Sequence, residues 1–130
     1  MIVYAFDDVQ GVKLLERALK ELIGEGLIFQ GFTSTAALLH AAEQTLYDVA
    51  FADVECENGL KLLAELHRLY PRSNFIGVAE EAQISTALTL HRIYASGYLN
   101  KPYDKEALAD TLRHLRFPSG TEKPHTTISA

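Results

Sequence analysis

Short apolar segments alternate with amphipathic segments along most of the chain, and this alternation limits the possible folds more than any other feature. Each apolar segment is long enough for one buried strand and too short for a helix. We expect strands at residues 2–6, 26–32, 47–53, 74–79 and 96–100. Between and after them, apolar residues recur at helical spacing, which predicts helices near residues 9–24, 33–44, 58–71, 82–94 and 104–116. Strands alternating with helices predict an α/β fold with one five-stranded parallel sheet, doubly wound and covered by helices on both faces.

The ends of these helices carry recognisable signals. Thr33 or Ser34 is positioned to cap the second helix, and Asp104 to cap the last one. Gly24 or Gly26 is expected to end the first helix, where a residue that tolerates a positive φ is favoured. In the last helix, the spacing of the apolar residues predicts an inward face made of Ala107, Leu108, Leu112 and Leu115.

Composition narrows the class of protein. The 130 residues are 48% hydrophobic, which suits one globular domain with a core. The net charge of −5 argues against direct nucleic-acid contact, which needs a basic face. The sequence contains neither an apolar run of membrane-spanning length nor a basic signal-peptide start, so we expect no membrane association and a cytoplasmic location. Residues 1–117 are expected to form the domain, and the Pro- and Gly-containing residues 118–130 a flexible tail or linker.

Three carboxylates stand where expected strands end. Asp7 and Asp8 follow the first strand and Asp53 ends the third, so all three meet at one rim if these strands are neighbours. Adjacent like charges are costly unless a cation neutralises them. Mg²⁺ prefers such oxygen ligands, and Lys101 after the fifth strand can reach the same rim. This set suits phosphoryl transfer, with Asp53 the candidate nucleophile.

These residues resemble the receiver (CheY-like) domain of two-component response regulators. The resemblance covers residues 1 to about 117 and rests on the FDD start, YDVAFAD, the following Gly59 and Leu60, and ASGYLNKPYD. It implies a flavodoxin-like three-layer (βα)5 sandwich. It also implies a signalling domain rather than an enzyme, with at most self-catalysed phosphorylation and dephosphorylation.

The resemblance implies a role for each matching residue of the acidic rim. Asp53 corresponds to the phosphoacceptor. Asp8, Asp53 and the main-chain carbonyl of Glu55 correspond to the Mg²⁺ ligands, and Asp7 to a residue that acts on the ion through water.

The last strand and its loop also match the family. Lys101 corresponds to the lysine that contacts the phosphoryl group, and Lys101–Pro102 to a cis-proline junction, which is rare enough to be a selected feature. Tyr98 corresponds to the aromatic switch residue whose side chain turns inward on activation.

Two departures from the family pattern concern signalling. Ala79 stands at the switch position where the family has a serine or threonine, and alanine has no hydroxyl to bind a phosphoryl group. The loop VECEN after Asp53 is short, lacks the common proline and adds Glu55 and Glu57. These two acids favour a cation but oppose an incoming phosphoryl group. The sequence therefore predicts an assembled site with weakened coupling between phosphate and Tyr98.

Three functional interpretations follow. The first is a receiver that accepts a phosphoryl group from a histidine kinase or another phosphodonor on Asp53 and regulates a transcriptional output. The second is a pseudo-receiver, a protein-interaction module with weak or no phosphorylation-dependent switching. The third, a hydrolase of the haloacid-dehalogenase kind, is disfavoured because its two aspartates are normally separated by one residue.

The family resemblance also suggests an interaction surface. Receivers often dimerise through the fourth helix, fifth strand and fifth helix, and this surface includes Arg92, Tyr94, Lys105 and Asp110. The five histidines show no metal-ligand spacing. Cys56 is expected to be an inert thiol, because Glu55 and Glu57 on either side raise its pKa.

Overall fold

The computed structural model describes residues 1–80, 90, 92 and 95–115. The expected helix at 82–94 therefore lies outside the described residues except for Leu90 and Arg92, and the expected tail at 118–130 lies wholly outside them. The strands are β1 (Ile2–Phe6), β2 (Ile28–Phe32), β3 (Val49–Asp53), β4 (Asn74–Ala79) and β5 (Gly97–Asn100). The helices are α1 (Val9–Ile23), α2 (Thr35–Gln44), α3 (Gly59–Leu69) and α5 (Lys105–Arg113), with a short 3-10 turn at Gly24–Gly26.

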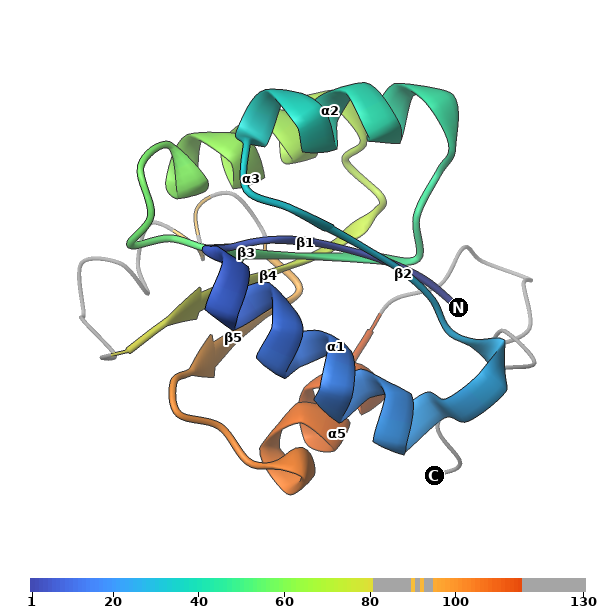
Figure 1. Cartoon of the computed structure of the whole chain (residues 1–130). Coiled ribbons are helices and arrows are strands. Elements are labelled where there is room, and N and C mark those ends of the chain that lie inside the picture. Colours follow the sequence, from blue (N-terminus) through green and yellow to red (C-terminus); the bar gives the residue numbers. More distant parts are fainter. Residues whose placement is uncertain (81–89, 91, 93–94, 116–130) are drawn as a thin grey trace.

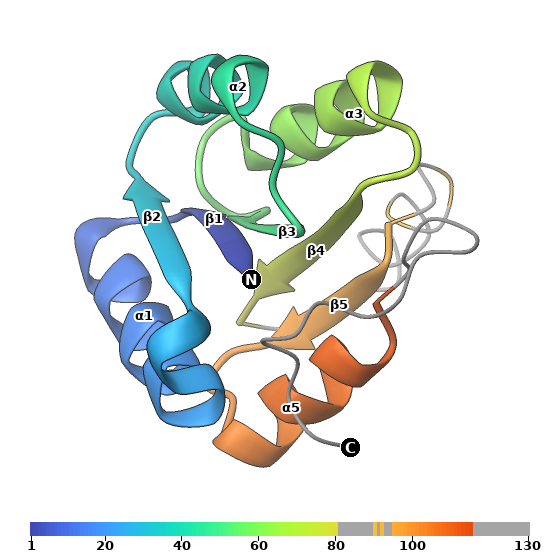
Figure 2. The same ribbon diagram turned by 90° about the vertical axis from the view of Figure 1, so that its right-hand side faces the viewer.

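The five strands form one parallel sheet in the order β2-β1-β3-β4-β5 (Figure 2). Helices α2 and α3 cover one face, and α1 and α5 cover the other (Figure 1). Each face buries its own apolar cluster: Leu19 and Leu108 belong to the cluster under α1 and α5, and Leu38 and Leu63 to the one under α2 and α3. The predicted doubly wound parallel α/β fold is confirmed, including the expected neighbourhood of β1 and β3.

Side-chain caps start three of the helices where the sequence places polar residues. The side chain of Asp8 accepts a hydrogen bond from Gly11 N (2.7 Å), Ser34 from Ala37 N (3.3 Å), and Asp104 from Ala107 N (2.8 Å). These bonds satisfy main-chain donors that the first helical turn leaves without partners. At the other end of α1, Gly24 has a φ of 79°, as expected for a helix-ending glycine.

One expectation about the inward face of α5 is wrong. Ala107 is exposed, whereas Leu108, Leu112 and Leu115 are buried as expected. Ala109 takes the remaining inward place at 6% exposure. Because successive helical residues are 100° apart, Ala107 and Ala109 lie on opposite sides of Leu108, and the sheet is on the side of Ala109.

Among the described residues, none of the helices combines the length and apolar character that a membrane crossing requires.

Candidate functional site

The carboxyl ends of the strands bring Asp7, Asp53 and Lys101 together. Asp7 follows β1, Asp53 is the last residue of β3, and Lys101 follows β5. The Lys101 ammonium group donates hydrogen bonds to Asp7 Oδ2 (2.7 Å) and Asp53 Oδ2 (2.6 Å). Its main-chain N–H also donates to Ala79 O (2.7 Å), which fixes the start of the loop against β4. Lys101 thus neutralises two acids that lie 94 and 48 residues before it in the chain.

These ion pairs are shielded from water. Asp53 is 5% exposed and Asp7 is 9% exposed. Burial lowers the pKa of Lys101, but the hydrogen bonds to Asp53 and Asp7 outweigh it and raise the pKa, so the ammonium form is held. Burial raises the pKa of Asp7, and the hydrogen bond from Lys101 offsets part of this rise. Charges at this rim interact more strongly than at an open surface.

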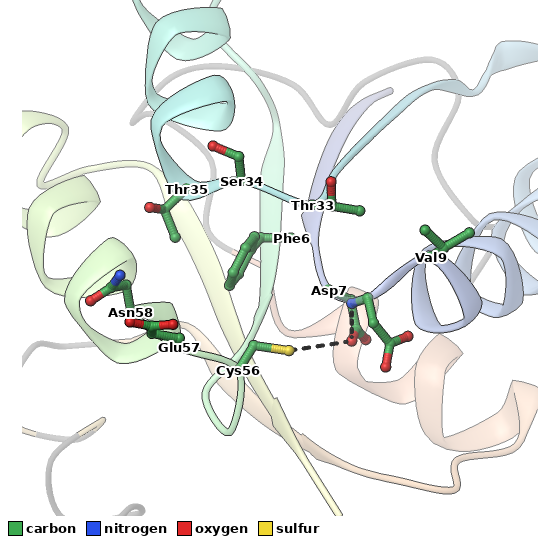
Figure 3. A pocket seen from close by; sticks show the side chains of 10 residues that line it. Phe6, Asp7, Val9, Thr33, Ser34, Thr35, Cys56, Glu57 and Asn58 are labelled. Carbon is green, nitrogen blue, oxygen red and sulfur yellow. Dashed lines mark hydrogen bonds between the residues drawn. The ribbon is translucent and has the colours of Figure 1, made fainter.

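The second oxygen of each buried carboxylate is also hydrogen-bonded. Asp53 Oδ1 accepts from Glu55 N (2.7 Å) and Cys56 N (3.2 Å), so the loop after β3 folds back over the carboxylate. Asp7 Oδ1 accepts from Asp8 N (2.7 Å), and the Cys56 thiol points at the same oxygen from 3.8 Å (Figure 3). Both carboxylates therefore have defined orientations.

Two glycines permit the close packing of helices against these acids. A Cβ atom on Gly11 in α1 would lie 2.1 Å from Asp7 Oδ2. A Cβ atom on Gly59, the first residue of α3, would lie 1.9 Å from the main-chain oxygen of Asp53. Neither separation is possible for real atoms, so any side chain at Gly59 must displace α3 from the end of β3.

The donor set fits a divalent cation. Ligand atoms of Asp7, Asp53 and Cys56 lie within 4.8 Å of one another. Asp8, which the resemblance predicts as a direct ligand, caps α1 through Oδ1 and is exposed. A cavity of about 540 Å³ opens beside these residues, and its lining includes Asp7, Asp8 and Glu57 together with the hydroxyl side chains of residues 33–35 (Figure 3). Carboxylate oxygens beside an open cavity suit Mg²⁺, which retains several waters when it is bound.

The residues at the ends of β4 and β5 are not part of the ion pairs of Lys101. Ala79 ends β4 and is 2% exposed. Glu80 follows Ala79, and its main-chain N–H donates a hydrogen bond to the Glu55 carboxylate. Burial raises the pKa of the Tyr98 hydroxyl on β5, and the charges of Glu55 and Asp53 raise it further. The peptide bond between Lys101 and Pro102 is cis.

Sequence reasoning missed the contact of Cys56 with Asp7. The pKa of the Cys56 thiol is raised to about 11, the direction expected, but the causes are burial, Asp53 and Asp7 rather than its chain neighbours. No local pattern announces this contact, because it joins residues 49 positions apart. The Glu55–Glu80 contact was also missed, for the same reason.

Comparison with known proteins agrees with this geometry. The family described as "Response regulator receiver domain" matches residues 3–113, so the chain belongs to the receiver-domain family of response regulators. No match is found among curated proteins. Receiver domains are signalling domains of two-component systems, which confirms the family expected from the sequence.

Solved structures show the same fold at low sequence identity. The chemotaxis protein CheY4 of Vibrio cholerae superposes with a TM-score of 0.79 at 20% identity, over 88% of this chain and 98% of that one. The receiver domain of NtrX from Brucella abortus gives 0.76 at 22% identity, over 88% and 98%. A response regulator from Burkholderia pseudomallei, solved with a phosphorylated aspartic acid, a calcium ion and citrate, gives 0.72 at 23% identity, over 85% and 65%.

Proposed function

We propose that this chain accepts a phosphoryl group from a histidine kinase on Asp53, with Mg²⁺ bound at the neighbouring acids. The observation that carries the proposal is the shared contact of Lys101 with Asp53 and Asp7, which joins three residues distant in sequence at one buried rim. Two acids around one lysine leave a net negative charge at the rim, and a bound cation would neutralise it.

Each residue has a part in the transfer. An Asp53 carboxylate oxygen attacks phosphorus as the bond from phosphorus to the donor nitrogen breaks, and the departing imidazole keeps that electron pair and takes a proton. Lys101 neutralises oxygens of the transferred group. Mg²⁺ supplies charge neutralisation for the incoming phosphoryl oxygens when bound. Asp8, Asp53 and the Glu55 carbonyl would hold the ion, with Asp7 acting through water. Asp8 caps α1 through Oδ1 and would offer Oδ2.

The comparison with Burkholderia pseudomallei supports the chemistry. That regulator, which shares the fold, carries a phosphorylated aspartic acid and a calcium ion. Phosphorylation of an aspartate and binding of a divalent cation are therefore compatible with this scaffold.

Intact mass after incubation with acetyl phosphate and Mg²⁺ tests the proposal. The wild type is expected to gain one phosphoryl group, and Asp53→Asn to gain none. Equal labelling of the two proteins would exclude Asp53 as the acceptor. The absence of label, together with failure to bind beryllofluoride, would favour the alternative below.

A second candidate function is a pseudo-receiver that binds partners without a phosphorylation switch. Ala79 favours it, because this buried residue has no hydroxyl with which to sense a phosphoryl group. Partner binding that depends strictly on Asp53 phosphorylation would exclude this function.

The output is proposed to be transcription, exerted through another domain in the cytoplasm. The fold of this chain matches 27% of a longer NtrX chain from Brucella abortus, which supports a receiver joined to further domains. We propose residues 1–117 as the receiver and 118–130 as the connection. Homodimerisation would use Lys105 and Asp110 of α5, and sedimentation with and without beryllofluoride tests it; monomer in both would exclude it.

A further inference from the structure

We propose that the Glu55 carboxylate competes with the phosphoryl group of Asp53 for the main-chain N–H of Glu80, and so connects phosphorylation to the end of β4. The inference rests on the proposed function and assigns a regulatory role to a residue of the same rim.

The hydrogen bond from Glu80 to Glu55 joins two loops that are 25 residues apart. Glu55 lies two residues after Asp53, and Glu80 follows the last residue of β4. The strands below them are tightly registered: Asp53 pairs with Val78, and Val54 N donates to Val78 O at 2.9 Å. The Glu80 N–H therefore lies just past the end of β4, the strand that pairs with β3 at Asp53.

Of the two described residues at the end of β4, the side chain of Ala79 has no hydrogen-bond donor, and Glu80 offers its main-chain N–H. This N–H is the donor that we infer a phosphoryl oxygen on Asp53 would bind there. Glu55 already uses the Glu80 N–H, in a charge-assisted hydrogen bond of the stronger kind. A phosphoryl group brings a charge of about −1.5 to −2 beside this carboxylate. Repulsion and loss of the donor then both favour release of Glu55.

Release of the Glu55 carboxylate would also change the electrostatic environment of β5. Tyr98 lies on that strand and pairs with Gly77 of β4. The negative charge of Glu55 acts on the Tyr98 hydroxyl in the unphosphorylated protein. Movement of this carboxylate changes the charge around Tyr98 without any hydroxyl at residue 79. Glu55 would thus couple the phosphoryl group to Tyr98, which the side chain of Ala79 cannot do.

Glu55→Ala and the matched control Glu57→Ala test the inference. Both residues are exposed loop acids, and Glu57 makes no hydrogen bond or ion pair with the part of the chain that the structure describes. We expect Glu55→Ala to be labelled by acetyl phosphate and Mg²⁺ about tenfold faster than the wild type, because one repelling charge and one competitor are removed. Glu57→Ala is expected to stay within about twofold.

The amide signal of Glu80 in a nitrogen-15 NMR spectrum tests the contact without phosphorylation. It is expected to shift in metal-free Glu55→Ala and to stay in place in Glu57→Ala. A wild type that is labelled at the same rate as both variants would overturn the inference and leave the proposed function intact. No label in any of the three proteins, together with failure to bind beryllofluoride, would overturn the proposed function and the competition together. An unshifted Glu80 amide would show that the contact with Glu55 is absent and would overturn the inference alone.

Discussion

The rim at the carboxyl ends of the strands has two halves that are built in different ways. The acceptor half comprises Asp7, Asp53 and Lys101, which are joined by short, buried ion pairs. The relay half comprises Glu55, Ala79, Glu80 and Tyr98, where an exposed carboxylate reaches one main-chain N–H. The residues of the acceptor half are held by strong contacts that are shielded from water. The residues of the relay half are held by a weaker contact that is exposed to water.

Under the proposed function, this difference would separate acceptance of a phosphoryl group from the response to it. The acceptor half would then supply the nucleophile and the charges of the transfer. The relay half needs only a group whose position changes with charge, and different side chains can fulfil this need. This chain has no hydroxyl side chain at residue 79, at the end of β4, while Asp7, Asp53 and Lys101 are in contact.

Removal of the lysine should affect the acceptor half most. In Lys101→Met, two buried carboxylates lose their cation, and we expect the free energy of unfolding to fall by about 3 kcal/mol in EDTA. Mg²⁺ is expected to restore part of this loss, because it neutralises the same acids. Urea unfolding with and without Mg²⁺ measures both effects.

Lys105→Met is the matched control. Lys105 also pairs with an acid, Glu21, at 2.7 Å, but both side chains are at least half exposed. Exposed pairs contribute little, so a change within about 0.5 kcal/mol is expected. If the two variants unfold alike, the ion pairs of the acceptor half are no stronger than those of the surface.

The Cys56 thiol reports the charge of the acceptor half through its pH dependence. Its pKa is raised to about 11 by burial and by Asp53 and Asp7, so the reactive thiolate is scarce at neutral pH. At pH 8 without metal, alkylation by iodoacetamide is expected to be about a hundredfold slower than for a thiol with a pKa near 9. The rate should rise with pH until about pH 11.

Asp7→Asn removes one of these charges and should lower the pKa of Cys56, which speeds alkylation at pH 8. Glu57→Gln, next to Cys56 in the chain, should leave the rate nearly unchanged, because Glu57 is not among the charges that shift this pKa. The reverse order of the two variants would mean that sequence neighbours, rather than the folded rim, control the thiol.

The glycine at the start of α3 holds that helix against the acceptor. Gly59→Ala is expected to lower the free energy of unfolding by about 2 kcal/mol, because its Cβ meets main-chain atoms that cannot move alone. Gly97→Ala in β5 is the control: its nearest neighbour would be Thr111 Cγ2 at 3.5 Å, an ordinary contact. Thermal unfolding compares them, and equal effects would show that α3 shifts freely at the acceptor.

Most of the fold is predictable from the sequence because it depends on local periodicity. The strands at 2–6 and 74–79 match the expected ranges, and the other expected strands were longer than the observed ones by one to two residues at their first ends. Some of these extra residues are apolar or aromatic, such as Leu27 and Tyr47, but they precede the first residue of the observed strand. Pattern alone does not show where hydrogen bonding to a neighbouring strand starts.

The acceptor half was predictable because carboxyl ends of neighbouring parallel strands meet at one rim. The different contacts of Asp7 and Asp8 could not be predicted, because they depend on how each side chain is oriented. Asp7 accepts a hydrogen bond from Lys101, whereas Asp8 accepts one from Gly11 N. The contacts of Cys56 and Glu55 also depend on how the loop after β3 folds back over Asp53. Such turns leave no periodic trace in the sequence.

The smallest expected effect is a change in beryllofluoride affinity when a hydroxyl group is introduced at residue 79 of the relay half. In Ala79→Ser, the new hydroxyl can donate to a phosphoryl group on Asp53. One such hydrogen bond contributes about 1 kcal/mol, so beryllofluoride should bind about fivefold more tightly in the presence of Mg²⁺. Isothermal titration of wild type and variant measures the change.

Ala52→Ser is the control, because Ala52 is as buried as Ala79 but stands one residue before the end of β3. Its hydroxyl should lower stability without a gain in affinity, since burial of an unpaired polar group is unfavourable. An Ala79→Ser protein that binds beryllofluoride no better than wild type would show that residue 79 does not face the phosphoryl group. Residue 79 would then be too far from the phosphoryl group for any side chain there to bind it, and the missing hydroxyl would not be the sole reason for weak coupling.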